Sequence, residues 1–327
     1  MPIRALYPRL TPVRPILWKD TSMIRIGAFI AASIATLIGT GAMSARDIPA
    51  PGVPVSVIVT AVGQKDAAAP QLTADDVLVS ENRQHMPVTG LEPLRGQNGL
   101  QLWLLIDDGS ASSLGNQLAD LKKFVLAQPA TTQIGIGYMR NGGVQMVQPL
   151  TLDHQLAAHA MRLPTAMPGI SASPYQALGE LIHKWPAGSA AREVLMVTSG
   201  IDPDYGSGPD NPYLTAAIDK AQRAGIVVYS MYYSGAGRSG HAYRQLFWGQ
   251  NYLAQLSDET GGELYDLGPQ NPVSMGPYLD DLSRRLNSQY LLTFVAIPEH
   301  KAGFQNVKIT AEHPHVKLAG PSKVYVP

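Results

Sequence analysis

One short polar segment combines a carboxylate with two hydroxyls at a spacing that could bind a metal ion. It spans residues 107–113 and reads DDGSASS, so that Asp108, Ser110 and Ser112 are spaced two residues apart. Mg²⁺ takes oxygen ligands and usually keeps several waters, so one carboxylate and two hydroxyls on a tight loop would suit it. The same side chains could instead cap a following helix, because aspartate and serine are favoured at helix N-termini.

The elements around this segment predict where it lies in the fold. Leu100 to Ile106 is continuously apolar, as expected of a strand that is buried on both faces. Further strand patterns alternate with helical ones: strands are expected at 133–139, 144–147, 194–198, 226–232, 263–265 and 290–296, and helices at 118–126, 153–163, 175–185, 214–224, 243–260 and 278–287. This alternation predicts an α/β fold, a doubly wound, largely parallel sheet with helices on both faces. Ligands of such sheets bind at the carboxyl ends of the strands, which is where residues 107–113 would lie.

Shorter β-rich segments flank this α/β domain. Strand patterns at 53–62, 77–80 and 86–91 predict a small N-terminal β module, and those at 304–311 and 316–326 predict a C-terminal β tail. We therefore expect four parts: a signal peptide or N-terminal anchor at 1–45, a linker and small β module at 46–96, the α/β domain at 97–297, and the β tail at 298–327.

The first of these parts has the pattern of an export signal. Arg25 precedes an uncharged apolar run from Ile26 to Met43, and the small residues Ser44 and Ala45 follow it. The pattern predicts an exported protein, which would be periplasmic, secreted or attached to a bacterial envelope. The run is also long enough to stay uncleaved as a membrane anchor.

Composition excludes several classes of function. Lys and Arg number 25 and Asp and Glu number 25, so the net charge is zero, and a nucleic-acid partner is not expected. The chain has no cysteine, which excludes thiolate metal sites, iron–sulfur clusters and cysteine nucleophiles. Apolar residues make up 45% of the chain, enough to bury a sizeable core.

From about Leu100 to Ala296 the chain resembles the von Willebrand factor type A domain. The resemblance rests on the Asp-x-Ser-x-Ser loop after the first central strand, on residues 134–143 and on residues 193–202. The chain resembles more closely a bacterial group of related domains, which carry a β segment before the domain and a β tail after it. The resemblance implies a metal-ion-dependent adhesion site at the strand ends, where an acidic group of a partner protein completes the metal shell.

Carried over residue by residue, this adhesion site is degenerate. The resemblance implies the ligands Asp108, Ser110, Ser112, Ser173 and Asp202. Asp107 remains an alternative to Asp108, and Ser171 an alternative to Ser173. Ser199 stands where the family has an aspartate, and Asp202 lies three residues further on. Because a carboxylate is lost beside the ion, we expect no cofactor, or only weakly bound Mg²⁺.

Two other motifs could carry chemistry. Residues 235–240 match G-x-G-x-x-G, but they come late in the domain rather than in its first βαβ unit, which favours a flexible loop over a dinucleotide site. His313 and His315 could bind a metal, but their surroundings favour a surface loop. No G-x-S-x-G elbow follows a strand.

These observations together predict an exported, non-enzymatic binding or scaffold protein. Its expected partner is another, unidentified protein, held by the strand-end loops at 107–114, 167–174 and 200–212. No catalytic residue is assigned, and contact with a membrane is expected only through an N-terminal anchor. The alternative is a secreted hydrolase or nucleotide-binding enzyme on the same fold, and a third possibility is a structural envelope protein.

Overall fold

The computed structural model describes residues 52–63, 69–94, 99–109, 114–165, 172–188, 190–234, 243–268, 273–298 and 301–327. The expected signal or anchor at 1–45 lies outside these residues. Across the described ranges, no helix combines the length and the apolar character needed to cross a membrane.

A six-stranded sheet forms the centre of the α/β domain. Its strand order is β10-β9-β8-β5-β6-β7, from β10 (Leu264–Asp266), β9 (Ile226–Tyr232), β8 (Ala191–Thr198), β5 (Leu100–Asp107), β6 (Thr132–Arg140) and β7 (Gly143–Thr151). All neighbours are parallel except β6 and β7, which form an antiparallel hairpin. Asn141 and Gly142 connect this pair with positive φ angles, as the sequence Asn-Gly predicts for a tight hairpin turn.

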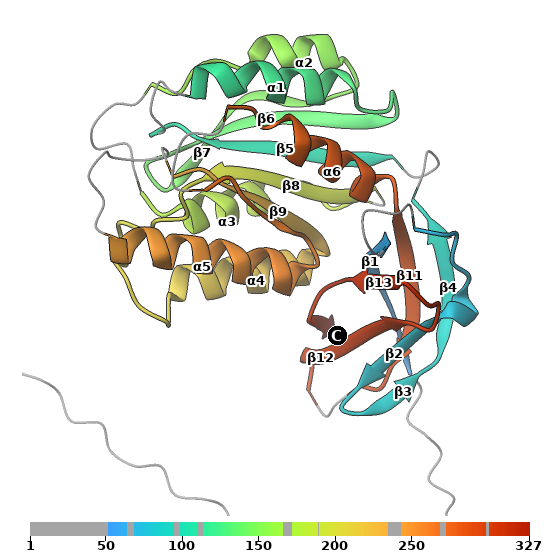
Figure 1. The fold of residues 1–327 in the computed structure, drawn as a ribbon. Coiled ribbons are helices and arrows are strands. Elements are labelled where there is room, and N and C mark those ends of the chain that lie inside the picture. The colour runs from blue at the N-terminus through green and yellow to red at the C-terminus, as the bar shows by residue number, and fades with distance from the viewer. Residues whose placement is uncertain are drawn as a thin grey trace, which may run out of the picture. The chain divides into compact units, whose positions relative to one another are not determined.

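Within the described residues, three helices cover each face of the central sheet, as Figure 1 allows the reader to follow. On one face, Leu102, Leu104 and Ile106 of β5 share a core with α1 (Gly115–Leu126), α2 (His154–Ala160) and α6 (Gly276–Leu286). On the other face, Trp103 and Leu105 share a core with α3 (Pro174–Lys184), α4 (Pro212–Ala224) and α5 (Tyr243–Thr260). The predicted doubly wound fold is therefore confirmed, with β5 at its centre.

The helix ends show why the chain folds this way locally. Ser173 begins α3 by accepting a hydrogen bond from the backbone N–H of Gln176, and Asn211 begins α4 by accepting two from its first turn. Each of these helices also has a proline in its first turn, where no hydrogen bond is lost. Gly225, with φ at +64°, ends α4 in the left-handed conformation.

The last strand expected for the α/β domain belongs to a different sheet. β11 (Gln289–Ala296) pairs antiparallel with β1 (Val53–Gly63) on one side and with β4 (Val88–Pro93) on the other. Burial alternates along most of β11, whereas β9 is buried throughout. Such alternation is typical of an antiparallel strand with one face on a core. β11 therefore lies outside the central sheet, to which the sequence pattern assigns it.

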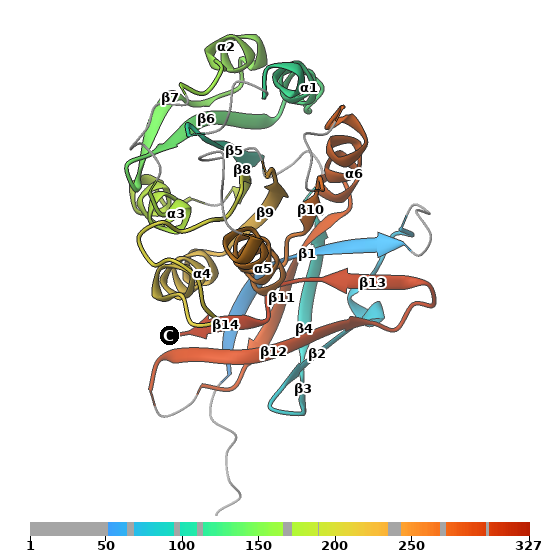
Figure 2. The ribbon, with the colours of Figure 1, turned by 60° about the vertical axis from the view of Figure 1, so that its left-hand side comes forward.

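The N-terminal β module and the C-terminal β tail are interleaved rather than separate. The first sheet has the order β13-β1-β11-β4, and the second has the order β14-β12-β2-β3. Their remaining strands are β2 (Val77–Glu81), β3 (Gln84–Met86), β12 (Gly303–Ala311), β13 (Val316–Ala319) and β14 (Lys323–Val326). The expected single stretch at 316–326 divides at Gly320-Pro321-Ser322, so that β13 and β14 enter different sheets. Figure 2 shows β12 beside β2, and β13 beside β1.

A buried carboxyl lies where this β unit meets the central sheet. Glu193, near the start of β8, is fully buried and accepts a hydrogen bond from Nε2 of Gln289 in β11. The same Gln289 nitrogen also lies 3.1 Å from the hydroxyl oxygen of Tyr229 in β9. Burial raises the pKa of Glu193 to about 8, against a lowering effect of the Gln289 hydrogen bond. Glu193 is therefore mostly protonated at neutral pH.

Candidate functional site

The candidate site lies where the strand order of the central sheet reverses direction. β5 leads into α1 on one face, and its neighbour β8 leads towards α4 on the other. Loops that leave two adjacent parallel strands towards opposite faces open a crevice at the carboxyl ends, which is the usual ligand position in such sheets. The segments that follow β5 and β8 carry the residues predicted from the sequence.

Asp107 joins the ends of these two strands. Its Oδ2 accepts a hydrogen bond from the hydroxyl of Thr198 at 2.9 Å, and its Oδ1 accepts one from the backbone N–H of Gly109 at 2.9 Å. Burial raises the pKa of Asp107 above its ordinary value, although both hydrogen bonds act in the opposite direction. Asp107 thus links β5 to β8 within the protein.

Asp108 is paired with an arginine that the sequence analysis did not single out. Nη1 of Arg162 donates to Oδ1 of Asp108 at 2.6 Å, and Nη2 donates to Oδ2 at 3.1 Å. The backbone N–H of Thr165 also donates to Oδ1, at 3.0 Å, and Arg140 lies 4.0 Å from Oδ2. Burial alone would raise the pKa of the fully buried Asp108, but the hydrogen bonds from Arg162 and Thr165 lower it below its ordinary value.

Arg162 is itself fixed by Tyr138 of β6. The Tyr138 hydroxyl accepts a hydrogen bond from the Arg162 backbone N–H at 2.8 Å and donates one to its carbonyl oxygen at 2.5 Å. The guanidinium carbon lies 4.0 Å from the centre of the Tyr138 ring. The sequence pattern placed Arg162 inside a helix at 153–163, whereas α2 ends at Ala160 and leaves it in the following loop. An isolated arginine beyond a helix end, two residues before Pro164, was the signal that could have found it.

Asp202 organises the loop after β8. Its Oδ2 accepts hydrogen bonds from the hydroxyl of Ser173 at 2.8 Å and from Nδ2 of Asn211 at 2.9 Å. Its Oδ1 accepts from the backbone N–H groups of Asp204 at 3.0 Å and Tyr205 at 3.3 Å. Four donors occupy the acceptor positions of this fully buried carboxylate. Asp202 therefore braces the 200–212 loop and connects it to the start of α3.

The predicted metal ligands thus fall into two groups, with different partners. Ser173 and Asp202 are in direct contact, whereas Asp108 pairs with Arg162. Ser199 is buried, and its hydroxyl accepts from the backbone N–H of Ile201 at 3.5 Å. The expected ligands Ser110 and Ser112, and the alternative Ser171, lie outside the described residues.

A divalent ion does not fit these side chains as they are arranged. The Arg162 guanidinium already hydrogen-bonds both carboxylate oxygens of Asp108, and hydrogen-bond donors already contact the carboxylate of Asp202. Within the described part of the chain, no group of three or more His, Cys, Asp or Glu side chains could hold a metal. Metal binding at this edge of the sheet remains a prediction from the sequence.

Aromatic side chains extend from the 200–212 loop to the surface along α5. The hydroxyl of Tyr252 hydrogen-bonds both the backbone N–H and the carbonyl of Gly208. Tyr252 stacks on Trp248 with ring centres 5.7 Å apart, and Trp248 contacts Phe247 edge-on at 5.6 Å. Phe247 is 48% exposed, and Tyr243, one turn earlier, is 83% exposed. Sequence reasoning did not assign these aromatics, although their helical spacing is visible.

The two remaining motifs add no described site. Residues 235–240, which match G-x-G-x-x-G, lie outside the described residues. His313 is partly exposed, and its Nδ1 lies 2.8 Å from the carbonyl oxygen of Pro314. This contact agrees with the surface-loop interpretation of His313.

No protein-family model matches the sequence, and no curated protein matches it either. Among solved structures, an aerotolerance-related membrane protein from Bacteroides fragilis is 13% identical, with a TM-score of 0.42, over 58% of this chain and 99% of that one. The conserved hypothetical protein BatB from Bacteroides thetaiotaomicron gives 13% identity and a TM-score of 0.42, over 58% and 97%. A von Willebrand factor type A protein from Catenulispora acidiphila gives 12% identity and a TM-score of 0.39, over 86% and 75%.

These likenesses are too weak to define a function. The strand order, the antiparallel β7 edge and the three helices on each face define the class of the central domain. It is a doubly wound α/β domain with one antiparallel edge strand, as the resemblance to the von Willebrand factor type A domain implies, and a two-sheet β unit is added to it.

Proposed function

We propose that this chain is an exported, non-enzymatic module that binds another protein at the carboxyl edge of its central sheet without needing a metal ion. The observation that carries the proposal is the ion pair of Arg162 with Asp108. The guanidinium neutralises Asp108, which the resemblance to the type A domain assigns as a metal ligand. The positive charge that neutralises Asp108 is then a permanent part of the protein.

The binding surface consists of the 200–212 loop and the first turns of α5. Tyr243 and Phe247 are exposed large aromatics, which are enriched at the centres of protein interfaces. Asp204 and Asp210 are exposed on the neighbouring loop. Because Asp202 and Tyr252 hold this loop in place, a partner would meet a preformed surface and lose little free energy in ordering it. A partner with apolar side chains beside basic ones would suit this surface.

Export rests on the sequence alone. The apolar run after Arg25 and the small residues at 44 and 45 support transfer across a membrane. Mass spectrometry of the protein from its native source should find an N-terminus near Ala45 or Arg46 if the signal is cleaved. A cytosolic species that retains residues 1–45 would contradict export.

The binding surface can be tested with paired variants. Cross-linking of the wild type in envelope preparations, followed by quantitative mass spectrometry, should give a partner whose yield falls at least tenfold in Tyr243→Ala/Phe247→Ala. Leu152→Ala/Leu156→Ala is the matched control, because both leucines are at least half exposed but lie at β7 and α2. Equal yields from both double variants would contradict the assignment of the surface. Steady turnover of ester, phosphate or dinucleotide substrates that is lost in Ser110→Ala would contradict the non-enzymatic role.

A further inference from the structure

A pocket lies at the opposite edge of the central sheet from the candidate site. It has a volume of about 230 Å³ and is bounded by the start of β1, the end of α4 with the start of β9, and β14. A cavity of this volume can hold a molecule of the size of an amino acid or a small metabolite. Val57, Ile226 and Val324 supply apolar lining.

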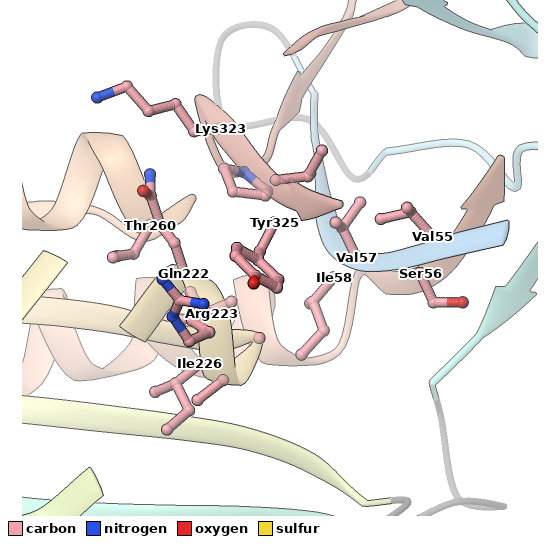
Figure 3. A pocket seen from close by; sticks show the side chains of 15 residues that line it. Val55, Ser56, Val57, Ile58, Gln222, Arg223, Ile226, Thr260, Lys323 and Tyr325 are labelled. Carbon is pink, nitrogen blue, oxygen red and sulfur yellow. The ribbon is translucent and has the colours of Figure 1, made fainter. Parts of the chain in front are cut away.

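An arginine at the mouth of the pocket is fixed by aromatic rings instead of a carboxylate. The guanidinium carbon of Arg223 lies 3.9 Å from the ring centre of Tyr325 and 5.1 Å from that of Phe304. Figure 3 shows Arg223 and Tyr325 side by side in the pocket. Over the described ranges, Arg223 has no acidic partner, whereas Lys323 lies 3.7 Å from Glu259. The guanidinium of Arg223 is thus held in one orientation, and its N–H groups can donate hydrogen bonds to an anion.

A buried amide oxygen on the same wall also lacks a partner. Gln222 is only 8% exposed, and its Nε2 donates to the carbonyl oxygen of Glu259 at 2.7 Å. That bond fixes the orientation of the amide, because a flipped side chain would set two oxygens against each other. Its Oε1 is buried and accepts no hydrogen bond from the described residues. Because almost none of its surface is accessible to solvent, this oxygen is out of reach of a ligand in the pocket, and Gln222 only shapes the wall.

We propose that this pocket binds a small carboxylate that carries an apolar group. The carboxylate would pair with the guanidinium of Arg223, and the apolar group would contact Val57 and Val324. An N-acylated apolar amino acid has this chemistry. It occurs both as a free metabolite and as the C-terminal residue of a peptide. The site is independent of the proposed protein-binding surface.

Calorimetry with N-acetylleucine and its methyl ester on the full chain tests the proposal. N-acetylleucine should bind saturably at millimolar concentration or below, and the ester, which lacks the anion, should not bind. Arg223→Gln should weaken binding at least tenfold, because a charge-assisted hydrogen-bonded pair is lost. Lys308→Gln is the control, since it removes an exposed cation of β12 outside the pocket lining.

Each outcome decides for or against the site. Absence of saturable N-acetylleucine binding, equal binding of the ester, or equal binding by folded Arg223→Gln would overturn the proposal. If Arg223→Gln does not fold, the acid–ester comparison on the wild type decides alone. A longer peptide that ends in leucine distinguishes the two sources: tighter binding than N-acetylleucine identifies a chain end, and weaker binding identifies a free metabolite.

Discussion

Arg162 holds both carboxylate oxygens of Asp108, at 2.6 and 3.1 Å, and so joins the loop after α2 to the end of β5. Asp108 is fully buried, whereas about a third of the Arg162 side chain is exposed. The pair therefore brings a buried negative charge and a partly hydrated positive one together at the edge of the sheet. Because the pair connects the loop after α2 to the end of β5, it stabilises the fold as well as forming part of the candidate site.

Removing the arginine should leave the buried carboxylate without a counter-charge. We expect Arg162→Met to lower the free energy of unfolding by about 2–3 kcal/mol. This is below the 3–5 kcal/mol typical of fully buried pairs, because Arg162 is partly exposed. Urea unfolding followed by circular dichroism measures the change. Adding Asp108→Asn to Arg162→Met should recover part of the loss, and a double variant less stable than Arg162→Met would contradict the pairing.

Metal affinity should depend on the same arginine. The wild type should bind Mn²⁺ no more tightly than millimolar, because Arg162 occupies Asp108 and Ser199 supplies no charge. Arg162→Gln/Ser199→Asp removes the competing cation and adds a carboxylate, so it should bind Mn²⁺ at least tenfold more tightly in calorimetry. Arg140→Gln is the control, since Arg140 lies further from Asp108, at 4.0 Å. Tight binding by the wild type would contradict the proposed metal independence.

The sequence was sufficient to predict most of the central domain. Short apolar runs such as Leu100–Ile106 and Val194–Thr198 are typical of strands covered on both faces, and the Asn-Gly turn predicts the β6–β7 hairpin. α5 occupies Tyr243–Thr260, the range that its pattern and the following glycines predict. Local periodicity and turn residues carry this information, so no distant contact is needed to infer it.

Long-range pairing could not be inferred in the same way. β11 pairs with β1 across more than two hundred residues, and nothing local in Tyr290–Ala296 identifies that partner. The partners of the candidate site residues could not be inferred for a related reason. Spacing predicts Asp108 and the resemblance implies Asp202, but Arg162 and Asn211 satisfy these carboxylates from other parts of the chain. A carboxylate's sequence neighbours do not reveal which cation or donor the fold will bring to it.

The central strand should dominate stability. Leu104 is fully buried in the middle of β5, and leucine-to-alanine changes in cores cost about 2–5 kcal/mol through lost burial and the cavity left behind. Leu104→Ala should therefore lower the melting temperature by several degrees in calorimetric scans. Leu152→Ala provides the comparison, because its side chain is 56% exposed and should change stability by about 0.5 kcal/mol or less. Similar shifts in both variants would be inconsistent with this packing.

Glu193 should make the stability of the protein depend on pH. Its pKa is about 8 in the folded protein, against the ordinary value of 4.5, because burial disfavours the charged form. The folded state therefore binds the proton more tightly than the unfolded state does. Its contribution is most favourable below pH 4.5, decreases as the pH rises from 4.5 to 8, and is constant above that. The loss is about 1.4 kcal/mol for each pH unit within this interval.

Glu193→Gln isolates this effect, because the amide has nearly the same shape, keeps an acceptor for Gln289 and cannot ionise. Urea unfolding at pH 5 and at pH 8.5 should give similar stabilities for the two proteins at the lower pH and a more stable variant at the higher pH. Other groups titrate equally in both proteins, so the difference between them reports Glu193 alone. A difference that stays constant between the two pH values would show that Glu193 ionises normally in the folded protein.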